Sequence, residues 1–180
     1  IWEITMSLET SGSIEWPYPV KYGEETEVEA DVLVLGGGSS GCMAALAAAR
    51  KGAKVVLLDK GSTATSGAAG SGFDHWMDCP ANPASRVDPE EYTRMPLDVY
   101  KGGYGNYIST YITARDSYDV LLDLEKMGMQ VRDVNDEFEG APFRDEETKF
   151  LYAYDYETKN CMRVWGTGFK PALYKALRRS

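Results

Sequence analysis

Two short apolar runs with a small-residue stretch between them stand out in the hydrophobic pattern of this chain. Asp31–Leu35 and Val55–Leu58 are rich in Val and Leu, which is typical of strands buried on both faces. The Ala-rich stretch Ser39–Arg50 predicts a helix that can lie close to a sheet, and Gly52 supplies its C-terminal stop. The pattern therefore predicts a strand–helix–strand unit that ends at Asp59.

The first predicted turn carries three glycines in a G-x-G-x-x-G pattern. Gly36 suits the tight turn, Gly38 lets the backbone approach a pyrophosphate, and Gly41 lets the helix pack close to the strand. Asp59 follows Gly41 by 18 residues, close to the spacing of about 20 at which an acid binds the ribose hydroxyls. The combination predicts dinucleotide binding; a βαβ unit without a ligand is the alternative.

The segment after the second strand consists entirely of small residues. Gly61–Gly72 contains only Gly, Ser, Thr and Ala, a composition that also suits a flexible linker. Because it leaves the carboxyl end of a strand, where ligands lie in doubly wound folds, we expect it to contact the cofactor. His75, the single histidine, follows this loop and is a candidate catalytic residue, with a structural role as the alternative.

Downstream, the pattern predicts more helices than strands. A cap at Asp88 followed by Pro89 predicts a helix that runs to about Tyr100. A longer helix is expected over Asn106–Met127. Its predicted apolar face consists of Ile108, Tyr111, Ile112, Leu121, Leu122 and Leu124. Residues 132–149 are predicted to be a solvated surface segment, Leu151–Tyr156 an edge strand, and Lys170–Leu177 a helix.

Composition narrows the classes of function. The chain has 180 residues and a formal net charge of −9, which argues against a nucleic-acid binder and against attachment to anionic membranes. Cys42, Cys79 and Cys161 form no C-x-x-C motif, so we expect no metal site and no iron–sulfur cluster. No apolar run of about 20 residues is present, and no signal peptide is visible. We therefore expect no membrane span and a cytoplasmic location.

The motifs resemble a known group of flavoproteins. Asp31–Asp59, with Ala45 and Gly52 at the usual places, resembles the FAD-type dinucleotide fingerprint. Ser66–Gly72 resembles the isoalloxazine-contacting loop of the fumarate reductase and succinate dehydrogenase flavoprotein family, and adenylylsulfate reductase belongs to the same superfamily. Asp123–Val131 and Gly166–Leu177 resemble looser downstream segments of these proteins.

This resemblance implies a fold and a chemistry. The expected fold is α/β: a Rossmann-like, GR2-type FAD-binding domain with a parallel sheet flanked by helices, incomplete in this chain. Residues 1–30 are expected to be an N-terminal arm and residues 31–180 the N-terminal part of that domain. Ala64-Thr65-Ser66 lacks the histidine that attaches flavin covalently in some members, so FAD is expected to bind noncovalently.

The resemblance also implies hydride or electron transfer between a small-molecule substrate and an electron carrier. The carrier is expected to include a separate iron–sulfur subunit, and the main catalytic residues are expected beyond residue 180. The predicted cofactor contacts are Gly36, Gly38, Ser39, Ser40, Gly41, Asp59, Lys60, Gly61, Thr65, Ser66, Gly67, Ala68, Ala69, Gly70 and Gly72.

Two other functions remain open at this point. One is an NAD(P)-binding Rossmann enzyme, which the small-residue loop Gly61–Gly72 disfavours. The other is a non-catalytic flavin-binding or assembly subunit.

Overall fold

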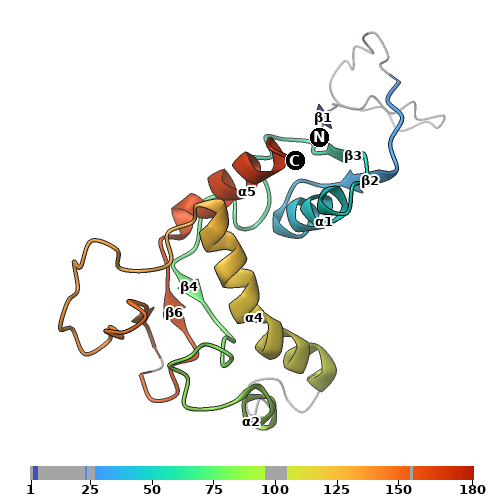
Figure 1. The fold of residues 1–180 in the computed structure, drawn as a ribbon. Coiled ribbons are helices and arrows are strands. Elements are labelled where there is room, and N and C mark those ends of the chain that lie inside the picture. The colour runs from blue at the N-terminus through green and yellow to red at the C-terminus, as the bar shows by residue number, and fades with distance from the viewer. Residues whose placement is uncertain (1, 4–22, 24–26, 96–104, 155) are drawn as a thin grey trace, which may run out of the picture. The chain divides into compact units, whose positions relative to one another are not determined.

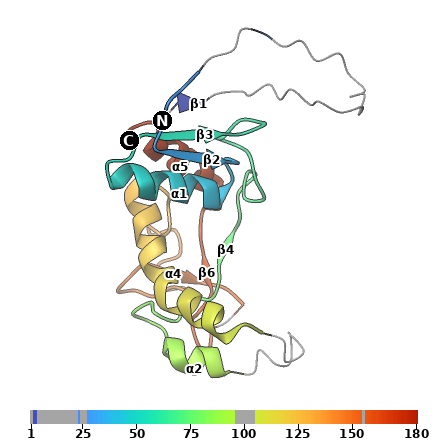
Figure 2. The same cartoon turned by 90° about the vertical axis from the view of Figure 1, so that its right-hand side faces the viewer.

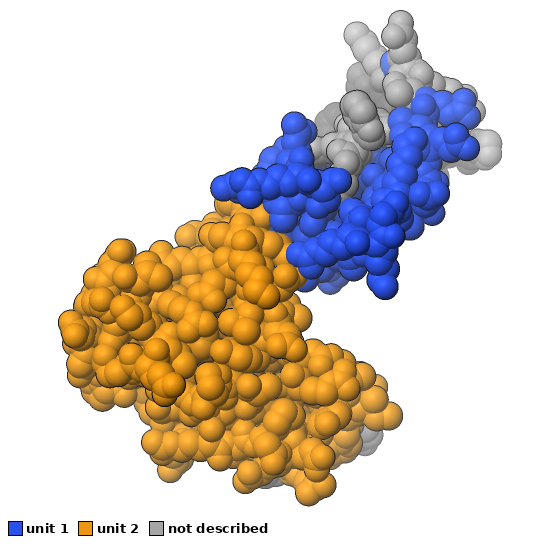
Figure 3. Space-filling model, in the orientation of Figure 1, with its two compact units in different colours: residues 1–70, 173–180 blue, residues 71–172 orange. Residues whose placement is uncertain are grey.

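A computed structural model describes residues 2–3, 23, 27–95, 105–154 and 156–180 (Figure 1). They form two compact units (Figure 3). Unit 1 comprises residues 1–70 with 173–180, and unit 2 comprises residues 71–172. Most of the predicted N-terminal arm lies outside the described residues.

Unit 1 contains the predicted strand–helix–strand unit. β2 (Val32–Leu35) is followed by α1 (Ser39–Arg50) and β3 (Val55–Leu58), so the predicted boundaries are confirmed. β2 and β3 pair in parallel with Val32 opposite Val55, and α1 packs along both strands (Figure 2). β1 (Trp2–Glu3) pairs in parallel with the other edge of β3. The result is a small parallel sheet in the order β1-β3-β2.

The prediction that the first strand is buried on both faces is wrong for half of its side chains. A Cβ on Gly41 of α1 would lie 3.4 Å from Val34 Cγ1, so Val34 faces the helix. Leu33 and Leu35 alternate with it and are 57% and 71% exposed. The reason is position, because β2 is at the edge of the sheet. The central strand β3 is buried from Val55 to Leu57.

Unit 2 is built on a second, antiparallel sheet that the sequence pattern did not predict as a whole. β4 (His75–Trp76) and β5 (Leu151–Tyr152) flank β6 (Met162–Arg163). The strand predicted near Leu151 is present and ends at Tyr152. It is the last strand of this sheet, as predicted, but its outer side still forms an isolated bridge between Leu151 and Arg144. The 3₁₀ turn η1 (Gly166–Gly168) leads from β6 into α5 (Phe169–Leu177). The core of this unit includes Leu121, Leu124, Met129, Phe150, Leu151 and Met162.

The long helix α4 (Tyr107–Met127) is confirmed with both of its ends. Asn106 accepts a hydrogen bond from the Ser109 N–H, and Gly128 closes the helix in the left-handed region at φ 106°. Its predicted apolar face is only partly right, because Ile108 is 74% exposed and Ile112 is also exposed. The buried stripe follows four positions at helical spacing: Ala114, Ser117, Leu121 and Leu124.

The helix α2 (Pro89–Arg94) begins as predicted and ends earlier than predicted. The Asp88 side chain accepts a hydrogen bond from the Glu91 N–H at 2.8 Å. Met95 has left the helical region at φ −55°, ψ 136°, because it precedes Pro96, whose ring disfavours the helical conformation of its neighbour. Residues 96–100 of the predicted helix lie outside the described residues.

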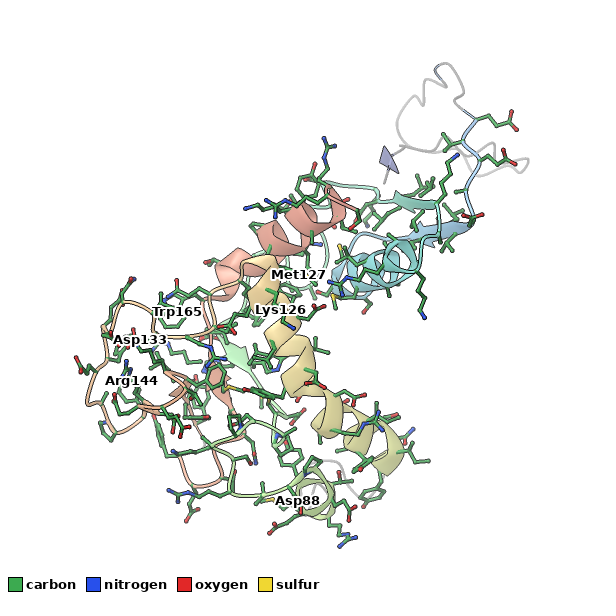
Figure 4. The ribbon with its side chains drawn as sticks, viewed as in Figure 1. Asp88, Lys126, Met127, Asp133, Arg144 and Trp165 are labelled. Atoms are coloured by element: carbon green, nitrogen blue, oxygen red, sulfur yellow. The ribbon has the colours of Figure 1, made fainter. Side chains whose placement is uncertain are left out.

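The segment 132–149 contains a buried ion pair, which contradicts its prediction as a purely solvated segment. Arg144 Nε lies 3.0 Å from Asp133 Oδ2, and the two side chains are 2% and 1% exposed. The same guanidinium pairs with Asp136 and Glu146, and the Asp133 carboxylate accepts the N–H groups of residues 137 and 138. Figure 4 labels Asp133 and Arg144 within this ion cluster, which consists of Asp133, Asp136, Arg144, Glu146 and Lys149.

Candidate cofactor site

The N-terminus of α1 offers backbone N–H groups without a capping side chain. Gly38 is the N-cap residue and α1 has no acidic residue in its first turn. The predicted contact residues Ser39, Ser40 and Gly41 form that turn, and the first helical bond runs from the Cys42 N–H to the Gly38 carbonyl at 2.9 Å. Exposed amides and the positive end of the helix dipole attract phosphate groups. This helix end therefore suits a pyrophosphate.

Two of the motif glycines have the structural roles predicted for them. Gly36 turns at φ +98°, while its N–H donates to the Leu58 carbonyl at 2.7 Å. A Cβ on Gly41 would lie 1.9 Å from the Gly36 oxygen, so only glycine lets the helix start this close to the turn. A Cβ on Gly38 would make an ordinary contact of 3.7 Å with Gly67. The close ligand approach predicted for Gly38 stays a prediction.

Asp59 lies at the end of β3 and bonds both neighbouring loops. Its Oδ2 accepts the Gly37 N–H at 2.6 Å and lies 2.6 Å from Ser66 Oγ, which donates to it. Its Oδ1 accepts the Gly61 N–H at 3.0 Å. The sequence predicted an acid at this position for the ribose, whereas the bonds to Gly37 and Ser66 were not predicted.

The loop after β3 is a series of tight turns, which disfavours the flexible-linker alternative. The N–H groups of Thr65 and Ser66 both donate to the Ser62 carbonyl. A Cβ on Gly67, which has φ +83°, would lie 2.8 Å from Gly38 Cα, and one on Gly70 would lie 1.9 Å from the Thr65 oxygen. Unit 1 thus brings Ser66 and Gly67 to the Gly-rich turn, while Ala68 and Ala69 lie in the turn that the Gly70 N–H closes on the Gly67 carbonyl. Lys60 is exposed between Asp59 and Gly61.

Sequence reasoning missed two residues that support this turn. The sequence pattern assigned Cys42 no contact with the turn, yet its thiol donates to the Gly37 carbonyl at 3.2 Å. Thr63 is buried, and its side chain would lie 3.0 Å from a Cβ on Gly37. Neither has a motif signal, because the dinucleotide fingerprint specifies neither a cysteine after Gly41 nor a threonine in the following loop.

Gly72, the last predicted cofactor residue, belongs to unit 2. It has φ +94°, and a Cβ there would lie 2.9 Å from Thr167 Cα. A Cβ on Gly166 would likewise lie 1.8 Å from the Phe73 oxygen. The two glycines therefore let the backbone after the small-residue loop cross the η1 turn, and Phe73 and Phe169 pack edge to face at 4.9 Å.

His75 is held by its neighbours in unit 2. It lies on β4 opposite Arg163, and its Nδ1 is 2.5 Å from Asp74 Oδ1. Its ring lies 4.3 Å from that of Tyr154, and its side chain is 17% exposed. This arrangement fixes the ring and leaves its chemical role a prediction.

The three thiols lie in the described part of the chain. All three cysteines are unbridged and buried, and burial raises the pKa of the Cys79 thiol to about 11. Within the described residues, no group of three or more His, Cys, Asp or Glu side chains could hold a metal ion. The geometry in unit 1 thus points to backbone-mediated binding of a phosphate-containing ligand.

Comparison with known proteins identifies the ligand class of the family. The sequence profile described as "FAD binding domain" matches residues 31–177, which is most of the chain. The chain belongs to this FAD binding domain family. Its members include the flavoproteins of fumarate reductase, succinate dehydrogenase and adenylylsulfate reductase, so the predicted resemblance is confirmed.

Solved structures share the fold at low sequence identity. Adenylylsulfate reductase from Archaeoglobus fulgidus matches with a TM-score of 0.62 and 23% identity, over 89% of this chain and 25% of that protein's chain. Mycobacterium smegmatis Sdh1, solved in complex with UQ1, matches with a TM-score of 0.58 and 18% identity, over 83% of this chain and 23% of that chain. The chain therefore spans about a quarter of the length of these relatives. No curated protein sequence matches it significantly.

Proposed function

We propose that this chain binds FAD noncovalently and forms the nucleotide-binding part of an oxidoreductase. The observation that carries the proposal is the junction of α1 with its two loops. Gly38 at the N-cap position leaves the helix N-terminus without a capping side chain, Gly41 leaves no room for a Cβ, and Gly67 of the small-residue loop lies against Gly38. The family match supports FAD as the ligand over a nicotinamide dinucleotide.

Each part of the site would make a distinct contribution to binding. The first-turn amides of α1 would hold the pyrophosphate, and Asp59 would accept a hydrogen bond from the adenosine ribose. The amides of residues 67–69 would stabilise negative charge on the reduced ring, since the Ser66 and Gly70 amides already donate within the loop. When bound, the flavin would supply hydride or electron transfer, while the protein supplies orientation and electrostatics.

The absorption spectrum of the full-length protein tests this proposal. We expect a flavin spectrum in the natively purified protein that moves entirely into the supernatant after denaturation. Flavin that stays with the denatured protein would contradict noncovalent binding. A well-folded full-length protein that neither carries nor takes up FAD would contradict the proposal itself, and uptake of NAD(P) would then favour the nicotinamide alternative.

The electron carrier and the substrate form a finer level of the proposal. We propose that electrons pass between a small-molecule substrate and a separate iron–sulfur subunit, which co-purification with broad visible absorbance would support. Flavin that is bound but reduced by no electron donor would favour the non-catalytic alternative. A cytoplasmic location remains a prediction from the sequence, and cell fractionation tests it. Among the described residues, no helix is long and apolar enough to cross a membrane.

His75 is proposed as a proton-transferring group for the same reaction. Its Nδ1 is engaged by Asp74, an arrangement that fixes the tautomer and orientation of a general acid or base. A His75→Gln variant with flavin bound, assayed for turnover across pH, is expected to lose activity and change its pH profile. An unchanged profile would assign His75 the structural role instead.

A further inference from the structure

The Asp59 carboxylate connects two loops that are distant in sequence. The Gly37 N–H lies 22 positions before it and the Ser66 hydroxyl 7 positions after it, and both reach Oδ2 at 2.6 Å. A carboxylate oxygen has two lone pairs, so these two donors use the acceptor capacity of Oδ2. Charge-assisted hydrogen bonds of this length are stronger than neutral ones.

The packing around this carboxylate requires the residues that are present. A Cβ on Gly37 would lie 2.5 Å from Asp59 Oδ2, so any larger residue would displace the carboxylate. Gly37 is buried, whereas Asp59 and Ser66 are half-buried. Ser66 Oγ also lies 3.0 Å from the Gly37 carbonyl, and its single O–H can donate either to this carbonyl or to Asp59. The three residues form one closed set of contacts.

We propose that Asp59, Ser66 and Gly37 form a latch that fixes the 61–70 loop against the Gly-rich turn before the cofactor binds. This inference rests on the proposed function and adds to it: Asp59 and Ser66 are positioning residues in addition to any contact with the ribose. Preorganising a loop lowers the entropy cost of binding.

Hydrogen exchange on the full-length protein without FAD tests the latch directly. In the Asp59→Asn and Ser66→Ala variants, we expect the Gly37 and Gly61 amides to exchange about tenfold faster than in the wild type. In the double variant, these amides should exchange no faster than in the more affected single variant, because both substitutions open the same latch. The control is Ser62→Ala, an exposed serine in the same loop, which should leave exchange unchanged. Ser66→Thr keeps the hydroxyl and should restore protection.

FAD titration of the same variants separates the latch from a role as ribose acceptor alone. With a latch, Asp59→Asn and Ser66→Ala both raise the Kd for FAD about tenfold. If Ser66→Ala changes neither exchange nor the Kd while Asp59→Asn weakens binding, the latch is overturned and the proposed function stands. If the wild type shows the protected amides and binds no FAD, the proposed function fails and the latch stands.

Discussion

Two loop regions of this protein, one in each unit, are ordered by different means. The Gly-rich turn and the 61–70 loop of unit 1 meet through closely packed backbone, with Gly41 and Gly67 leaving no room for a Cβ, and through the single carboxylate of Asp59. The ion cluster of unit 2 is held by charged side chains around a buried Arg144. The first arrangement leaves backbone amides at a helix end for a ligand, whereas the second pairs its own charges. We therefore expect the Gly-rich turn and the 61–70 loop to serve ligand binding, and the ion cluster to serve stability.

The largest expected effect comes from adding one methyl group to the Gly-rich turn. Gly41→Ala would place a carbon 1.9 Å from the Gly36 oxygen, so the turn must open and α1 must shift. We expect FAD to be lost on purification and Tm to fall by about 5–10 °C. Gly23→Ala is the control, since nothing lies within 4 Å of a Cβ there. A normal flavin content in Gly41→Ala would contradict the prediction that FAD binding requires the close approach at Gly41.

Removing the central charge of the ion cluster should reduce stability without reducing affinity for FAD. Arg144→Met leaves Asp133 buried without its cation, and we expect Tm to fall by about 5–10 °C. Arg115→Met removes an exposed pair with Asp116 and should change Tm by about 1 °C or less. Thermal unfolding of both variants measures the change in Tm, and FAD titration measures the change in Kd. A Kd that rises in Arg144→Met beyond the effect of Arg115→Met would contradict a purely structural cluster.

The ion cluster should also make stability depend on acid pH. The pKa of Asp136 is lowered by Lys149 and by Arg144, and the pKa of Glu146 by the Gly140 N–H and by Arg144. Their ordinary values are 3.8 and 4.5. Carboxyls with lowered folded-state pKa values stabilise the fold above those ordinary values, and the contribution is lost as pH falls through the lowered ones.

We therefore expect Tm to fall by a few degrees below about pH 4.5 through these groups. Arg144→Met should weaken this dependence, because Arg144 lowers both pKa values. Thermal scans between pH 3 and pH 7 measure it, with Arg115→Met as the control. A steeper acid dependence in Arg144→Met would contradict the assignment.

The smallest expected effect is on thiol reactivity, which reports on each of the two units separately. Cys42 supports the Gly-rich turn through its bond to Gly37, whereas Cys79 is buried in unit 2 with a pKa of about 11. We expect both to label slowly at pH 8, and FAD to slow Cys42 by about threefold while leaving Cys79 unchanged. Mass-spectrometric mapping of an alkylation time course measures this. Equal protection of both cysteines would mean that FAD stabilises the whole chain rather than the turn.

The sequence alone determined the features that depend on near neighbours. The ends of α1, the start of α2 and both ends of α4 follow from caps, a proline and glycines within a few residues. The Gly36 turn and the close approach at Gly41 follow equally from the local motif. Backbone conformation and side-chain capping act over one helical turn, so a sequence pattern contains the information needed to predict them.

Only the tertiary structure decided which side chains are covered and which charges meet. Leu33 and Ile108 are exposed although their patterns are apolar, because burial requires a neighbouring element on that face. Asp133 and Arg144 are buried although their segment is highly charged, because their charges pair and each has further partners in the cluster. Asp59 reaches Gly37 over 22 positions, and no local period encodes such a contact. Long-range packing therefore decides how the predicted motif is held together.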